Sequence, residues 1–132
     1  MVRVFAGRIV SMNIWDNRER QYHAPFDIII QTTPDTVPLR DMFDDSINPD
    51  TGKAYYDVDY MEQQVENGSA EWSVVNVQCL LNGVELGSFA IGGAYIDSHY
   101  DLKSFVYDHG MIDEAKNDAK IWLDNTKEVV YE

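Results

Sequence analysis

The chain has 132 residues, and its 23 Asp and Glu against 10 Lys and Arg give a formal net charge of −13. This charge argues against direct binding to nucleic acid or to an anionic membrane, and it favours a basic partner. Eight Tyr, five Phe and three Trp within a 45% hydrophobic composition argue against an acidic disordered chain, which would be poor in aromatic residues. We therefore expect one folded domain over residues 1–132.

Residues 1–31 predict a β-hairpin. Residues 2–15 are rich in β-branched and aromatic side chains with partial alternation, and the polar residues 16–20 resemble a turn. Residues 24–31 then predict a second strand, which is centred on Ile28, Ile29 and Ile30.

Residues 32–70 predict short acidic helices between two hairpins. Pro38 suits the first turn of a short helix that runs through Asp45. Residues 48–52 have the composition of a turn. Asp59 and Glu62 have the spacing of a capping box, so a second helix is expected to start there and to stop at residues 67–68, Asn-Gly.

Residues 71–95 give the clearest hairpin pattern. Residues 71–81 predict a strand, Asn82 and Gly83 favour a type I′ turn, and residues 84–95 predict the returning strand. The only cysteine, Cys79, lies in the first of these strands, where we expect a small buried side chain.

Two helices are expected at the C-terminus. Ser98, with Asp101 three residues later, suggests the N-cap of a helix that ends at residues 109–110. Apolar spacing from Ile112 to Leu123 predicts an amphipathic helix of about three turns. Residues 127–132 are expected to be a frayed end or an edge strand.

The expected fold class is therefore α+β. An antiparallel sheet of about four strands, in two hairpins, has short acidic helices inserted between the hairpins and two C-terminal helices packed on one face. The longest apolar runs are shorter than the ~18–20 residues that span a bilayer, and the first residues lack the apolar stretch of a signal peptide. We therefore expect a cytoplasmic protein.

Negative charge is concentrated in two segments. Residues 35–66 carry nine acids against Arg40 and Lys53, a balance of −7, and residues 97–132 carry nine acids against four lysines, a balance of −5. The intervening residues 67–96 carry only two acids and no Lys or Arg. This unevenness favours an acidic face over a uniformly charged surface.

Metal-binding patterns are incomplete. A calcium loop that starts at Asp44 fails at its sixth position, Pro49, and at its twelfth, Tyr55, where glycine and glutamate are needed. The three histidines are His23, His99 and His109, and no two of them have the four-residue spacing of a helical zinc motif. We expect neither a metal nor another cofactor.

Catalytic motifs are also absent from the sequence. It contains no Gly-x-Ser-x-Gly elbow and no glycine-rich phosphate loop. Adjacent acids lie on polar segments, whereas general acid–base catalysis needs one carboxyl with a pKa raised by burial. We expect a non-enzymatic protein.

The acidic segment over residues 35–66 is the candidate partner-binding surface. Tyrosine beside charge is typical of protein–protein hot spots, since it adds contact area at low entropic cost. The predicted site residues are Asp44, Asp45, Tyr56, Asp57, Asp59, Tyr60, Glu62 and Glu66. A second acidic face is expected from Asp113, Glu114, Asp118 and Asp124.

In size, charge and lack of catalytic motifs, the chain resembles the small accessory proteins of phages and mobile elements. That class includes inhibitors of CRISPR and restriction systems, several of which imitate DNA with acidic surfaces. The resemblance is one of composition and transfers no residues. It implies an inhibitor that docks an acidic, DNA-mimicking face onto a basic groove of a nucleic-acid-processing complex.

The sequence also leaves open that the acidic residues only confer solubility, and two other functions remain open. The first is a structural or assembly protein that self-associates through sheet edges or through the helix that carries Trp122. The second is a small metal-dependent hydrolase that uses His99, Asp101 and His109.

Overall fold

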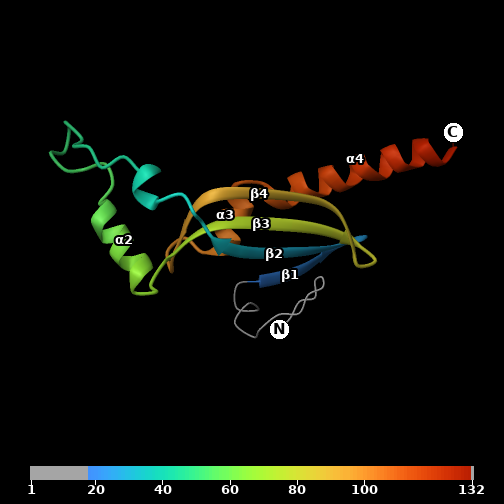
Figure 1. The fold of residues 1–132 in the computed structure, drawn as a ribbon, viewed down its shortest axis with the longest axis horizontal. Helices are drawn as coiled ribbons and strands as arrows, with labels where there is room; N and C mark the ends of the chain where they lie inside the picture. Colours follow the sequence, from blue (N-terminus) through green and yellow to red (C-terminus); the bar gives the residue numbers. More distant parts are fainter. Residues whose placement is uncertain (1–17, 132) are drawn as a thin grey trace.

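Four antiparallel strands form one sheet, in the order β1-β2-β3-β4 (Figure 1). The computed structural model describes the backbone of residues 18–131 and the side chains of residues 19–125. The strands are β1 (Arg18–His23), β2 (Phe26–Pro34), β3 (Glu71–Leu81) and β4 (Val84–Ile96). Each strand pairs with its neighbour in sequence, so the sheet consists of two hairpins joined through the β2–β3 pairing.

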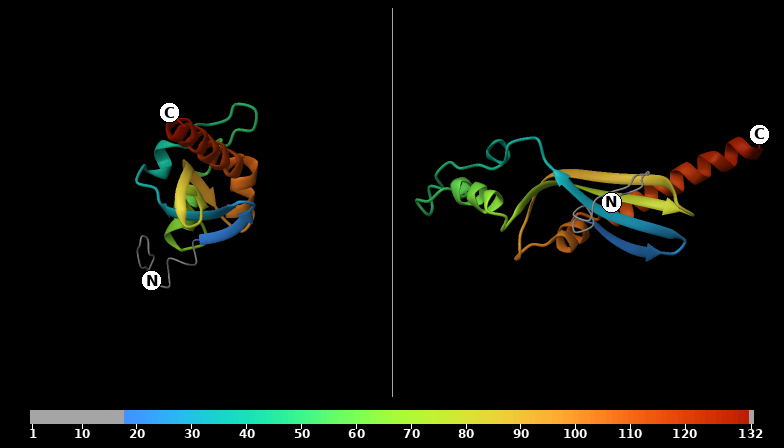
Figure 2. Two further views of the ribbon diagram at one scale, coloured as in Figure 1. Left: turned by 90° about the vertical axis from the view of Figure 1, so that its right-hand side faces the viewer. Right: turned by 60° about the horizontal axis from the view of Figure 1, so that its bottom comes forward.

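Two helical elements lie between β2 and β3, and two follow β4. The first pair is the short 3₁₀ helix η1 (Leu39–Asp41) and α2 (Val58–Glu66), and the second is α3 (Leu102–Asp108) and α4 (Met111–Tyr131). The predicted α+β class, with its four-stranded antiparallel sheet, is confirmed. Figure 2 shows the segment with η1 and α2 extending from one end of the sheet, while α4 continues past the other end.

The main core lies between the sheet and the C-terminal helices. Alternate residues of β2 and β3 point to this face, because side chains alternate across a strand. The core residues of the strands are Phe26, Ile28, Ile30, Val75, Val77, Cys79, Ala94 and Ile96, and those of the helices are Phe105, Val106, Met111, Ala115 and Ala119. Cys79 is fully buried, as the sequence predicts.

Helix α4 lies unusually close to β4. A Cβ atom on Gly87 would lie 2.5 Å from both the carbonyl oxygen of Ala115 and the amide nitrogen of Ala119. Ala115 and Ala119 are fully buried one helical turn apart. The absence of a side chain at Gly87 and the small side chains on α4 therefore allow two backbones to approach.

The second hairpin forms as predicted. β3 spans the predicted residues and β4 extends one residue further, to Ile96. Asn82 and Gly83 have φ angles of 52° and 81°, the left-handed conformation that a type I′ turn needs at both central residues.

The N-terminal hairpin differs from the prediction. The strand expected over residues 2–15 lies outside the described residues. Arg18–Arg20, which were expected in a turn, belong to β1, whose pairing with β2 runs from Arg18–Gln31 to His23–Phe26. The charged residues resemble a turn in composition, but a strand with one solvent-facing side accepts charged side chains, and Arg20 is exposed while Glu19 is half-buried.

Three helix boundaries also differ. The helix predicted from Pro38 to Asp45 is only the single turn η1, because the Asp44 side chain accepts the Ser46 N–H at 2.9 Å in a local turn that competes with helix. Asp57, rather than Asp59, caps α2 by accepting the Tyr60 N–H. Asp101, rather than Ser98, caps α3 by accepting the Ser104 N–H.

Helix α4 is longer than the predicted three turns. It has 21 residues, and residues 127–131, expected to be frayed or an edge strand, continue the helix. Residues 111–131 contain neither glycine nor proline. Asp113 and Glu114 lie in the first turn, where their negative charge stabilises the helix by its interaction with the helix dipole. Within the described residues, no helix is both long enough and apolar enough to cross a membrane.

Candidate functional site

The segment between β2 and β3, residues 35–70, is anchored to the end of the sheet; we call it the inserted module. The Trp72 indole Nε1–H donates to the Val37 carbonyl at 2.7 Å, and the Asp35 N–H donates to the Trp72 carbonyl at 3.1 Å. The Asp35 carboxylate accepts the Gly93 N–H at 2.7 Å. These bonds connect the start of the module to both β3 and β4.

A second, smaller core holds η1 and α2 against the sheet. Leu39, Val58 and Trp72 are its buried members. Phe43 packs on Trp72 with ring centroids 5.7 Å apart, and it contacts Tyr56 edge-on at 4.9 Å. The module therefore has its own apolar support, and its outer surface is held in a defined orientation.

The Asp35 contacts predict an acid-sensitive anchor. Backbone N–H groups of Val37 and then Gly93 hold the pKa of Asp35 below its ordinary value of 3.8, because they stabilise the charged form. A folded-state pKa below the unfolded value means that the stabilisation is present above about pH 4 and is lost as the pH falls further. We expect the NMR signal of the Trp72 indole N–H to shift in this range. In Asp35→Asn, this pH-dependent shift of the Trp72 signal should be absent. If the shift were unchanged in the variant, a carboxyl other than Asp35 would be its cause.

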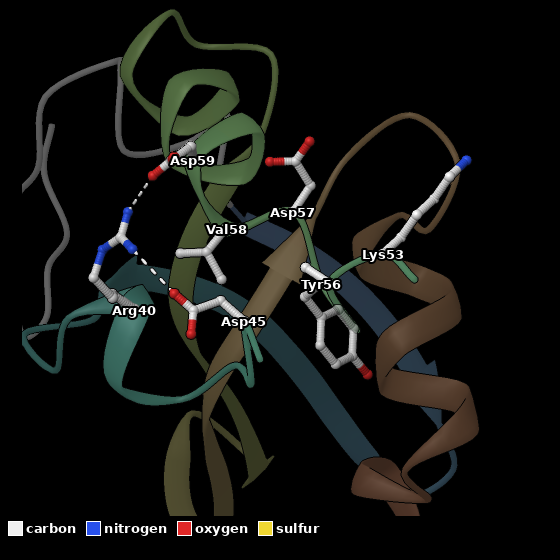
Figure 3. A pocket seen from close by; sticks show the side chains of 8 residues that line it. Arg40, Asp45, Lys53, Tyr56, Asp57, Val58 and Asp59 are labelled. Atoms are coloured by element: carbon white, nitrogen blue, oxygen red, sulfur yellow. Dashed lines mark hydrogen bonds and ion pairs between the residues drawn. The ribbon is translucent and has the colours of Figure 1, made fainter. Parts of the chain in front are cut away.

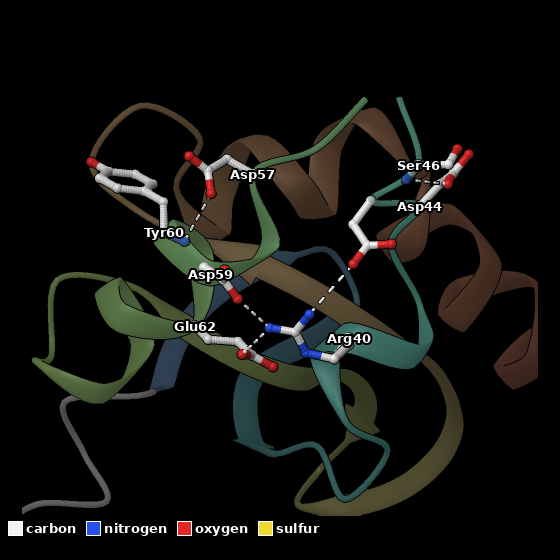
Figure 4. Close-up of polar contacts among 8 residues, drawn as sticks. Arg40, Asp44, Ser46, Asp57, Asp59, Tyr60 and Glu62 are labelled. Carbon is white, nitrogen blue, oxygen red and sulfur yellow. Dashed lines mark hydrogen bonds and ion pairs between the residues drawn. The ribbon is translucent and has the colours of Figure 1, made fainter. Parts of the chain in front are cut away.

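Arg40 brings together three of the predicted acidic residues (Figure 4). Its Nη2 donates to Asp59 Oδ1 at 2.5 Å and to Glu62 Oε1 at 2.8 Å, while its Nη1 lies 3.4 Å from Asp45 Oδ2. The hydrogen bonds to Glu62 and then Asp59 raise the pKa of Arg40 above its ordinary value. The charge of this part of the surface is therefore partly compensated from within the protein.

Asp44 and Asp57 have local structural roles. The side chain and backbone of Ser46 lower the pKa of Asp44 by hydrogen bonding to its carboxylate. The Asp57 carboxylate accepts the Tyr60 N–H at 3.1 Å and caps α2. Glu66 is the last residue of α2 and lies one turn beyond Glu62. All six predicted acids thus belong to one module, but five of them also take part in contacts that shape it.

A surface hollow of ≈ 550 Å³ lies among these residues (Figure 3). Its lining combines two cations with three carboxylates and an aromatic ring. The lining residues are Arg40, Asp45, Lys53, Ala54, Tyr56, Asp57, Val58 and Asp59. The hollow is therefore a mixed-charge site and not a purely acidic one, because both basic residues of the segment line it.

Exposed apolar side chains gather on the same module. Of the eleven large hydrophobic side chains exposed within the described residues, six lie between residues 35 and 70. They are Val37, Met42, Ile47, Tyr55, Tyr56 and Tyr60. Tyr56 and Tyr60, the predicted anchors, are 47% and 56% exposed. Sequence reasoning did not select Val37, Met42 and Ile47, since single apolar residues in an irregular segment show no periodicity.

The predicted second acidic face lies on α4. Asp113, Glu114 and Asp124 are exposed there, and Asp118 accepts the Ser88 N–H of β4 at 3.0 Å. On the same helix, Ile121 and Trp122 are 60% and 49% exposed. This face is thus separate from the inserted module, in keeping with the two acidic segments of the sequence.

The residues of the hydrolase hypothesis have other contacts. Asp101 caps α3, and the His109 ring stacks on Phe105 with centroids 4.1 Å apart, while its Nδ1 lies 2.8 Å from the Phe105 carbonyl. Among the side chains of residues 19–125, no group of three or more His, Cys, Asp or Glu has an arrangement that could hold a metal ion.

No protein-family model, curated protein or solved structure matches this chain.

Proposed function

We propose that the protein is a non-enzymatic binding protein whose inserted module docks onto a basic partner protein. The observation that carries this proposal is the coincidence, on one anchored segment, of a −7 charge balance with six exposed large hydrophobic side chains. Carboxylates provide long-range attraction to a cationic surface, and exposed tyrosines provide contact area at short range.

The support for a preformed surface comes from the second core. Trp72, Leu39 and Val58 are buried beneath the module, and Phe43 connects Trp72 to the exposed Tyr56. A surface that is ordered before binding loses less conformational entropy when the complex forms. Tyr56 and Tyr60 are therefore the proposed anchors, and the six carboxylates belong to the same module.

We further propose that the partner is a nucleic-acid-processing protein and that docking inhibits it. Double-stranded DNA presents one negative charge per ~1.7 Å of axis, so a nucleic-acid-binding groove is a basic surface suited to closely spaced carboxylates. The support is the −7 charge balance of residues 35–66, together with a net charge that opposes any direct contact with nucleic acid.

An affinity capture tests the proposal. The protein is immobilised and exposed to a lysate of its source cells, and the bound fraction is eluted with a salt gradient and identified by mass spectrometry. We expect a basic nucleic-acid-binding protein that elutes at moderate salt and is displaced by excess double-stranded DNA. A Tyr56→Ala, Tyr60→Ala bait should lose it, whereas a Tyr22→Ala, Tyr107→Ala bait, altered at exposed tyrosines elsewhere, should retain it. Equal recovery on all three baits would contradict the proposed surface.

Self-association is a second candidate function, and it is favoured by the exposed Ile121–Trp122 pair on α4. An apolar pair on a helix that continues past the sheet is suited to pairing with a second copy. Mass measured by light scattering should then rise with protein concentration and fall in Trp122→Lys. A constant monomeric mass would exclude this candidate.

A further inference from the structure

Arg40 joins two parts of the inserted module that are separate along the chain. Asp45 lies in the loop that follows η1, whereas Asp59 and Glu62 lie in the first turns of α2. Between them, residues 46–55 form a small reversal, with an Ile47–Ala54 bridge and a Tyr55 N–H to Ser46 carbonyl bond of 2.9 Å. These contacts, together with the Asn48 N–H to Lys53 carbonyl bond of 2.7 Å, lie within the reversal, whereas Arg40 connects its base to α2.

We infer that Arg40 is a positioning residue of the partner-binding surface, which holds the loop carboxylate of Asp45 and the helix carboxylates of Asp59 and Glu62 in one arrangement. The guanidinium is suited to this role because its planar group of donors can contact several carboxylates at fixed angles. This role rests on the proposed function, but the arrangement of the three carboxylates around Arg40 can be tested without a partner.

Removing Arg40 sets two physical effects against each other. Arg40→Gln changes the formal net charge from −13 to −14, since one cation is lost. If the surface acted only through its total charge, this variant would bind a cationic probe more tightly. If Arg40 positions the carboxylates, the variant should bind more weakly, because the probe must then order carboxylate side chains that the guanidinium no longer holds.

Lys103→Gln is the matched control. Lys103 is exposed on α3, outside the inserted module, and its replacement also gives a net charge of −14. The comparison of the two glutamine variants therefore removes the effect of total charge. Arg40→Lys provides the conservative variant, which keeps the charge but not the planar group of donors.

The first experiment follows trypsin cleavage after Lys53, which is exposed within the reversal. Site-resolved mass spectrometry gives the initial rate at this one bond, counted in chains still intact at residue 40, because that position is itself a trypsin site in the wild type and in Arg40→Lys but not in Arg40→Gln. We expect about threefold faster cleavage in Arg40→Gln, a smaller increase in Arg40→Lys and no change in Lys103→Gln, since the loop opens more often when its link to α2 is lost. Equal rates in Arg40→Gln and Lys103→Gln would overturn the inference.

The second experiment uses a fluorescent nona-arginine peptide as the cationic probe. We expect Arg40→Gln to bind it about threefold more weakly than Lys103→Gln at the same ionic strength, because the carboxylates are no longer held together. Tighter binding by Arg40→Gln would overturn the positioning role and leave the proposed function intact. Absence of binding by the wild-type protein would instead count against the proposed function, and the cleavage rates would still decide the role of Arg40.

Discussion

Gly87→Ala should lower the free energy of unfolding by about 3 kcal/mol, the upper end of the usual cost of overpacking. The added Cβ would lie 2.5 Å from Ala115 O and Ala119 N, and 3.0 Å from Ala119 Cα. All three are backbone atoms of α4, so a change of side-chain rotamer cannot relieve the contact. The helix must move away from β4, and the burial of Met111, Ala115 and Ala119 is reduced with it.

Urea unfolding followed by far-UV circular dichroism measures this effect. Ser88→Ala is the matched control on the neighbouring residue, because Ser88 is exposed and contacts Asp118 through its backbone N–H. The control should stay within about 0.5 kcal/mol of the wild type. Adding Ala119→Gly to Gly87→Ala should not restore stability, since the blocking atoms are main-chain atoms. A Gly87→Ala protein as stable as the control would contradict the close approach of α4 to β4.

Removing the charge of the six predicted acids should reduce partner affinity at least about 100-fold without unfolding the module. Asparagine and glutamine are used instead of alanine because Asn also accepts backbone N–H bonds at helix caps and in Asx turns. The local bonds of Asp44 and Asp57 should therefore survive. The substitutions are Asp44→Asn, Asp45→Asn, Asp57→Asn, Asp59→Asn, Glu62→Gln and Glu66→Gln.

A second six-fold variant gives the control for total charge. Its substitutions are Asp101→Asn, Asp108→Asn, Asp113→Asn, Glu114→Gln, Asp118→Asn and Asp124→Asn, all outside the inserted module. Both variants have a formal net charge of −7, because each loses six carboxylates from −13. If the module is the binding surface, calorimetric titration of the captured partner should show the large loss only in the first variant.

The salt dependence of binding distinguishes long-range electrostatic attraction from short-range contacts at the interface. Association driven by the module's charge should weaken as salt rises in the wild type, and this dependence should be smaller in the first variant. Equal losses of affinity in both variants would indicate that total charge, and not the module, attracts the partner. Retained affinity in both would exclude an acidic docking surface altogether.

Local patterns were sufficient for the second hairpin and for the buried centre of β2. The alternation of Val75, Val77 and Cys79 predicts the buried face of β3, and Asn82-Gly83 predicts the turn that follows, because both signals come from side-chain period and backbone conformation within a few residues. The same local signals failed at Arg18–Arg20, where charged residues belong to strand β1, and at the end of α4, where apolar spacing underestimated the length of the helix.

The sequence also identified the inserted module as the acidic segment with interleaved tyrosines, since charge and aromatic content are properties of composition. It could not show that Arg40 contacts Asp45, Asp59 and Glu62, because the residues are up to 22 positions apart in the chain. Nor could it show that Val37 and Met42 would be exposed on the same module.

By itself, the amino-acid sequence determined the strand–turn–strand unit from Glu71 to Tyr95, the burial of Cys79 and the charge of the module. These depend on residue type and short-range spacing. Only the tertiary structure decided that α4 packs closely on β4 at Gly87 and that Trp72 supports the module. It also decided that Arg40 contacts carboxylates on both sides of the reversal. Each of these is a contact between segments far apart in the chain, and its partner is selected by the packing of the whole fold.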